Sequence, residues 1–189
     1  MKRILLTLCA VMLAVALQAQ EHMTFKGIPI DGSLSSFVSQ LKSKGFTHEL
    51  TEGSIAMLKG DFAGKSDCTI GVLATKQSNT VWKVVVYFPE KTSWYSLKSE
   101  YKSFKESYTE KYGSPSSYEY FSDPYYEGDG YELQALRLEK CSYVSYYQTD
   151  KGYISVEIDD SKCVTVSYED AINVKIKSRE QEMSISEDI

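Results

Sequence analysis

Residues 141–168, CSYVSYYQTDKGYISVEIDDSKCVTVSY, decide the fold that we expect for this chain. The stretch holds three strand-like runs, and Ile154, Val156 and Ile158 share one face of the middle run. The connections, DKG and DDS, are short and consist of turn residues. Strands joined so closely must be antiparallel, because a parallel pair needs a crossover of a dozen or more residues. The stretch therefore predicts an antiparallel meander.

A helix is expected before this meander, over about 93–112. Apolar residues recur there every three or four positions, while lysines and glutamates occupy the other side. We expect the helix to end at Gly113, because a glycine followed closely by a proline, here Pro115, commonly terminates a helix. Between the helix and the meander we expect two further strands, over 117–121 and 131–138.

The first half of the chain shows the same order of elements. Leu34, Phe37, Val38 and Leu41 repeat at steps of three and four, which predicts a short helix over about 33–44.

Three strands are expected after this first helix, over 54–62, 67–75 and 81–88. In the last of them, strict alternation would place Trp82 on the same core-facing side as Val84.

Short antiparallel strands after each helix predict an α+β fold, built from two tandem helix-then-meander units at 20–90 and 91–176. Residues 177–189 mix charges with few bulky apolar side chains, so we expect a flexible tail. This order of elements resembles that of β-lactamase-inhibitor-protein-like domains of the bacterial envelope. The resemblance covers the order of elements alone, and it carries over no functional residue.

The N-terminus has the layout of a secretory signal peptide. A positive start precedes an apolar run of about 14 residues, shorter than the roughly 20 that span a bilayer. Cleavage after Ala19 would remove residues 1–19 and leave Gln20 first. A lipoprotein is disfavoured, because Cys9 lies inside the apolar run. We therefore expect a secreted protein of the periplasm or cell surface of a Gram-negative bacterium, with no membrane insertion after processing.

Charge argues against nucleic acid as a partner. After processing, 19 basic and 26 acidic side chains remain, a net charge of −7, against −5 for the whole chain. Only Arg137 and Arg179 remain as arginines, and they are far apart in sequence. Phosphate recognition relies on clustered basic residues, which this chain lacks.

Three cysteines, Cys68, Cys141 and Cys163, remain after processing, with no C-x-x-C spacing. In the proposed meander one strand separates Cys141 from Cys163, which places them roughly 9 to 10 Å apart, beyond the about 7 Å that a disulfide allows. We therefore predict that these two are not bonded to each other and that Cys68 is a buried thiol.

No motif in the sequence specifies a catalytic chemistry. His22 and His48 lack the sequence context of serine or cysteine hydrolases, although a pair of carboxylates working without histidine stays an alternative. Four acids in 123–132 offer oxygen ligands to calcium, but their spacing does not fit an EF-hand, and solvated turns are the simpler interpretation. We therefore predict a protein that is not an enzyme, with no catalytic residue, metal or cofactor.

Tyrosine is in excess, with 15 in the chain. Such rings combine an apolar face with a polar tip, which suits the recognition of proteins and sugars, although they also suit the faces of strands. The hypothesis is a secreted binding domain, inhibitor-like or assembly-factor-like, for a protein or glycan; the alternatives are a carboxylate-dependent hydrolase and a purely structural envelope component. The candidate binding residues are Tyr118, Tyr120, Tyr125, Tyr126 and Tyr131.

Overall fold

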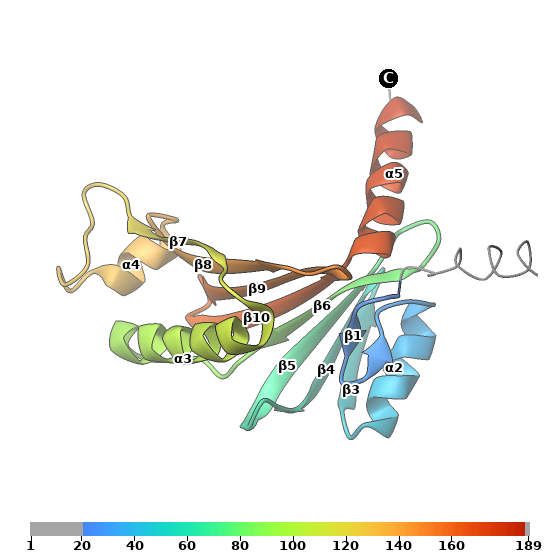
Figure 1. Cartoon of the computed structure of the whole chain (residues 1–189), viewed down its shortest axis with the longest axis horizontal. Coiled ribbons are helices and arrows are strands. Elements are labelled where there is room, and N and C mark those ends of the chain that lie inside the picture. The colour runs from blue at the N-terminus through green and yellow to red at the C-terminus, as the bar shows by residue number, and fades with distance from the viewer. Residues whose placement is uncertain (1–20, 188–189) are drawn as a thin grey trace, which may run out of the picture.

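Eight strands form one antiparallel sheet in the computed structural model, which describes residues 21–187 (Figure 1). Their order across the sheet is β3-β4-β5-β6-β10-β9-β8-β7. Because β6 pairs with β10, strands from both halves of the chain join in one continuous sheet. Their bounds are β3 Thr47–Glu52, β4 Ile55–Phe62, β5 Lys65–Ala74, β6 Val81–Tyr87, β7 Ser116–Phe121, β8 Cys141–Gln148, β9 Gly152–Asp159 and β10 Cys163–Asp170.

Helices α2 (Leu34–Ser43) and α3 (Trp94–Tyr112) lie on one face of this sheet, and α5 (Ala171–Glu187) rises from its other side (Figure 1). Serine caps fix where the first two begin. Ser33 Oγ accepts a hydrogen bond from the Ser36 amide at 3.3 Å, and Ser93 Oγ accepts one from the Ser96 amide at 3.2 Å. The remaining elements are α4 (Glu132–Arg137) and the small pair β1 (Thr24–Phe25) and β2 (Ile28–Pro29).

The hydrophobic core fills the space between the two helices and the sheet. Phe37 and Leu97, one from each helix, belong to a single buried cluster with Ile70, Val86 and Val166 of the strands. A fully buried side chain of this kind contributes about 1.5–3 kcal/mol. The expected α+β class and the antiparallel meander are confirmed. Both predicted units contribute to one sheet and one core.

The run 131–138 is not the strand that we expected. Residues Glu132–Arg137 form the helix α4, which contacts β8 and buries Ala135 and Leu136. Nearly every residue in this run is a good helix former, and that preference outweighs the partial alternation that suggested a strand.

Strand β3, which includes His48, was not predicted. All of its residues are exposed, because β3 is an edge of the sheet, so no burial pattern marks it.

The prediction that Trp82 faces the core was also wrong. Leu73 pairs with Lys83 and Ala74 with Val81, so Trp82 is the extra residue of a β-bulge and turns to the face opposite Val84.

The C-terminal segment that we expected to be a tail continues helix α5 as far as Glu187. Its acids and lysines suggested a solvated tail, but Glu180 is buried and bonded to the turn after β5. No helix within residues 21–187 is long and apolar enough to cross a membrane. The predicted signal peptide, 1–19, lies outside the described residues.

Candidate functional site: the open face of the sheet

The face of the sheet opposite α2 and α3, here called the open face, carries no helix across its centre (Figure 1). The pairing registers align its side chains in three rows that cross the sheet. From β5 through β6, β10, β9 and β8 toward β7, the rows are Leu73, Lys83, Glu169, Tyr153, Gln148; then Gly71, Val85, Ser167, Ser155, Tyr146, Ser116; then Thr69, Tyr87, Thr165, Glu157, Val144, Tyr118.

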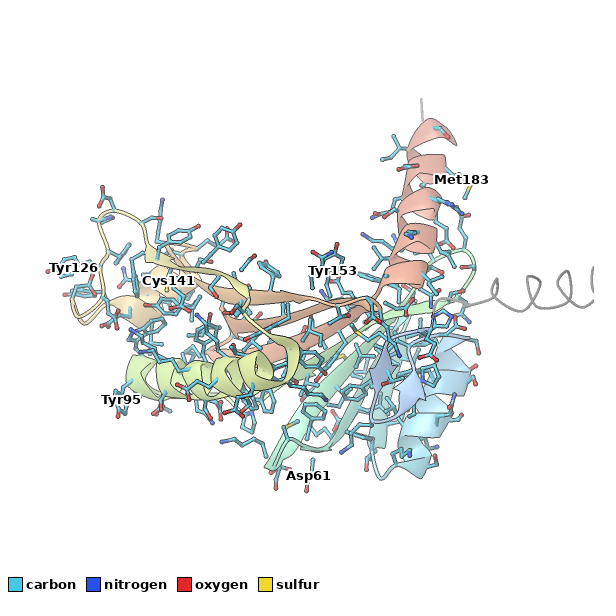
Figure 2. The ribbon with its side chains drawn as sticks, in the orientation of Figure 1. Asp61, Tyr95, Tyr126, Cys141, Tyr153 and Met183 are labelled. Carbon is cyan, nitrogen blue, oxygen red and sulfur yellow. The ribbon has the colours of Figure 1, made fainter. Side chains whose placement is uncertain are left out.

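Exposed tyrosines occupy the β7–β8–β9 part of the open face. The exposed fractions are 56% for Tyr118, 45% for Tyr146 and 46% for Tyr153. Tyr120, two residues after Tyr118 on β7, lies on the same face and is also exposed. The rings of Tyr118 and Tyr146 meet edge to face, with centroids 6.3 Å apart. Figure 2 shows Tyr153 standing above the sheet, away from α3. These rings form an aromatic surface that no other element of the described chain covers.

Small side chains fill the centre of the open face. Val85 and Ser167 are buried although no helix covers them, because larger neighbours surround them. A methyl group on Gly71 would lie 3.6 Å from both the Met57 sulfur and the Tyr87 ring. The open face is therefore close-packed as it stands, and it presents broad contact area rather than a deep cleft.

The charges of the open face are few and mostly paired. Lys83 Nζ donates to Glu169 Oε1 at 2.7 Å. Desolvation raises the pKa of Glu157, the Asp159 carboxylate raises it further, and Lys83 acts in the opposite direction. Desolvation also raises the pKa of the Tyr146 hydroxyl. The Tyr146 side chain therefore acts as a neutral ring and hydroxyl near pH 7.

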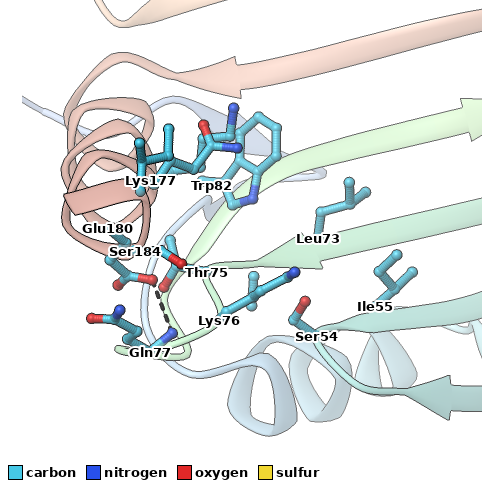
Figure 3. A pocket seen from close by; sticks show the side chains of 13 residues that line it. Ser54, Ile55, Leu73, Thr75, Lys76, Gln77, Trp82, Lys177, Glu180 and Ser184 are labelled. Carbon is cyan, nitrogen blue, oxygen red and sulfur yellow. Dashed lines mark hydrogen bonds between the residues drawn. The ribbon is translucent and has the colours of Figure 1, made fainter. Parts of the chain in front are cut away.

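A groove of about 550 Å³ adjoins the open face where α5 leaves the sheet (Figure 3). Leu73 and Ile55 belong to both the face and the groove, and Trp82 lines the groove's wall. The Lys177 ammonium lies 5.2 Å from the centre of the Trp82 ring. Glu180 closes one end, because its carboxylate accepts hydrogen bonds from the Gln77 amide at 2.9 Å and from the Ser78 hydroxyl at 2.6 Å.

The structure divides the five predicted tyrosines into two groups. Tyr118 and Tyr120 belong to the open face, whereas Tyr125, Tyr126 and Tyr131 lie in the connection between β7 and α4. Tyr126 is exposed at the end of this connection (Figure 2).

Tyr125 is half-buried, so its ring is not free to contact a partner as a binding residue would be. It packs against the core, and its hydroxyl accepts a hydrogen bond from Gln134 Nε2 at 3.0 Å. Tyr146 and Tyr153 are not among the predicted binding residues. The tyrosines of the predicted strands also include Tyr143 and Tyr147, which are buried.

The acids of 123–132 that have partners bind groups of the protein itself. Asp129 accepts hydrogen bonds from the Tyr126 and Tyr131 amides, at 3.1 and 2.7 Å, and Glu127 pairs with Lys98. Within residues 21–187 no group of three or more His, Cys, Asp or Glu is placed to hold a metal ion.

The histidines lie in different parts of the fold. His48 Nε2 is 2.8 Å from the Thr51 hydroxyl, whereas His22 lies between the carboxylates of Asp31 and Asp170, at 3.4 and 3.1 Å. The pairing of His22 with Asp170 was not predicted, because the two residues are far apart in the chain.

The three cysteines are free and buried, as predicted for Cys68 and for the pair Cys141 and Cys163. Strand β9 separates that pair in the sheet. Burial raises the pKa of Cys141 to about 12 and that of Cys163 to about 11, so neither is a thiolate near neutral pH.

Comparison with known proteins returned no match: no family model, no curated protein and no solved structure is similar to this chain.

Proposed function

We propose that this chain is an exported, non-enzymatic binding domain that docks a protein partner on the open face of its sheet. The observation that carries the proposal is the aromatic surface of Tyr118, Tyr120, Tyr146 and Tyr153, exposed on a sheet whose other face carries the helices and the core. Antiparallel sheets commonly leave one face to solvent, but that face is then dominated by polar side chains.

The size of the open face supports a protein as the partner. Strand spacings of about 4.8 Å give eight strands a width of about 34 Å, and six residues of about 3.3 Å give about 20 Å along the strands. The product, about 700 Å², is close to the roughly 800 Å² that each partner contributes to a standard interface. A broad surface of this kind fits a folded partner better than a small substrate, which normally binds in a cleft.

Rigid aromatic anchors also fit this role. Tyrosine loses little conformational entropy on binding and is enriched at the energetic centres of interfaces. Tyr146 lies on β8, with the edge strand β7 on one side and β9 on the other, so a partner that covers this part of the face buries its ring. The signal-peptide pattern of residues 1–19 supports export.

Alanine variants test the proposal once a partner has been captured from the native host. Tyr146→Ala and Tyr118→Ala should each weaken binding by about tenfold or more, because truncating an anchor costs about 2 kcal/mol. Tyr95→Ala, on α3 behind the sheet, is the matched control and should bind normally. Melting temperatures should change little for all three, since none of these side chains belongs to the hydrophobic core.

If Tyr126→Ala or Tyr131→Ala weakens binding and the open-face variants do not, the interface lies at the β7–α4 connection instead. Normal binding by both open-face variants would overturn the proposal.

A further inference from the structure

A second candidate site lies on the other side of the sheet, away from the open face. A cavity of about 630 Å³ separates α3 from the turn between β4 and β5. Lys65 and Lys91 enter it from the strand side, and Glu100 lies at its wall on α3. Four serines of α3 line it along the helix: Ser96, Ser99, Ser103 and Ser107.

Glu100 is the unusual member of this cavity. Its side chain is only 6% exposed, and its Oε1 atom lies 3.1 Å from Lys65 Nζ and 3.2 Å from Lys91 Nζ. The other oxygen, Oε2, is buried and has no hydrogen-bond partner in the described chain. A buried carboxylate oxygen without a donor is costly, so the site calls for a donor from outside the protein.

The neighbouring charges narrow the chemical class of that donor. Ammonium groups and metal cations are repelled by the two lysines, and a single carboxylate gives a metal too few ligands. An anion such as phosphate would suit the lysines, but the Glu100 carboxylate lies within 3.2 Å of both ammonium groups, offsets their charge and repels a second anion. A hydroxyl group both donates to the carboxylate and accepts from the lysines.

We propose that this cavity binds a saccharide, whose adjacent hydroxyls satisfy Glu100 and the two lysines together. The serines add further hydroxyl partners along the same helix face. Serine is a weaker helix former than the lysines and glutamates at the other exposed positions of α3, so local helix preference does not account for it there. Tyr95, 83% exposed, lies at the same cavity and offers a flat ring to a sugar.

Backbone-amide NMR titrations of the processed protein test this inference. The probes are cellohexaose, maltohexaose and chitohexaose, with inorganic phosphate as a separate arm. At least one oligosaccharide should shift the amides of Lys65 and of Ser96–Ser107 in a saturable way, with a Kd of about 1 mM or tighter, and phosphate should not.

Two variants make the result specific to the cavity. Ser103→Leu, at an exposed helix position, should abolish the shifts by placing a bulky apolar side chain in the row of serines, whereas Glu106→Leu, at an exposed position outside the cavity, should bind as the parent does. Glu100→Gln should weaken binding at least tenfold, since it removes a charge-assisted hydrogen bond.

No shift at these amides with any oligosaccharide, stronger shifts with phosphate, or normal binding by Ser103→Leu would overturn the proposal. In that case a bound water alone serves Glu100. These outcomes are independent of the open face, because every probe and variant acts on the opposite side of the sheet.

Discussion

Asn173 shows how one buried polar side chain joins three parts of the chain. From the first turn of α5, its Nδ2 group lies 2.9 Å from the Ile30 carbonyl, 2.9 Å from the Val81 carbonyl and 3.1 Å from Asp31 Oδ1. Its own backbone amide donates to Asp170. The sequence gives no sign of this role, because the partners are 92 or more residues away.

Replacing Asn173 by alanine should therefore destabilise the protein strongly. Two buried carbonyls lose their donor, at about 1–3 kcal/mol each, so we expect the free energy of unfolding to fall by about 2 kcal/mol or more. Urea denaturation measures this, with Lys175→Ala, exposed on the same helix, as the control. A loss below about 0.5 kcal/mol, the range of ordinary surface changes, would show that water replaces the amide.

Gly152 illustrates a position where only glycine fits. It opens β9 with a φ of 151°, and an added Cβ would lie 1.9 Å from the Glu169 carbonyl oxygen. We predict that Gly152→Ala lowers the free energy of unfolding by at least about 2 kcal/mol, because the backbone of paired β10 must move. Gly71→Ala, which meets only ordinary contacts, should change it by less than about 1 kcal/mol. Equal effects of the two variants in thermal and urea unfolding would contradict this account.

At the scale of elements, the sequence predicts helices and strands whose apolar residues recur with a clear period. It does not predict elements that are held in place by contacts with distant parts of the chain. Helix α3 was predicted because its apolar stripe is long, and β9 because its burial alternates fully. Strand β3 is an exposed edge that needs no apolar face, and α5 is apolar on no consistent side. Both are held by partners elsewhere in the chain, which periodicity does not report.

Helix α5 is attached to the sheet through Glu180. Burial alone would raise the pKa of this carboxyl, but hydrogen bonds from Ser78 and from the Gln77 amide outweigh it and hold the pKa below its ordinary 4.5. A group whose pKa is lowered by folding stabilises the protein above its unfolded pKa, and that stabilisation is lost as the pH falls through the folded value.

We therefore predict that Glu180→Gln is less stable than the parent at pH 7, by about 2 kcal/mol, with the difference shrinking at pH values below about 4.5. Urea unfolding of both proteins across this pH range is the measurement. Glu182→Gln, an exposed neighbour, should show no difference at either end. If the difference in the free energy of unfolding between Glu180→Gln and the parent stays constant with pH, the charge of Glu180 does not hold the helix in place.

At the scale of the whole molecule, the candidate site follows from the order of the strands. Tyr118 and Tyr146 are far apart in sequence, and they meet only because β7 pairs with β8 in one particular register. The sequence identified the excess of tyrosine and two residues of the open face, Tyr118 and Tyr120. It did not identify Tyr146, because β8 also holds the buried Tyr143 and Tyr147, and only the packing of α3 tells them apart.

Site-specific photo-crosslinking in the native host tests most directly whether the open face is the binding surface. Benzoylphenylalanine, a photoreactive aromatic residue, would replace Tyr146 or Tyr153 on the open face, Tyr126 in the β7–α4 connection and Tyr95 on α3, one position at a time. The account predicts that both open-face positions capture one and the same protein and that Tyr95 captures none. Capture of a common partner from Tyr95 or Tyr126 but from neither open-face position would contradict it.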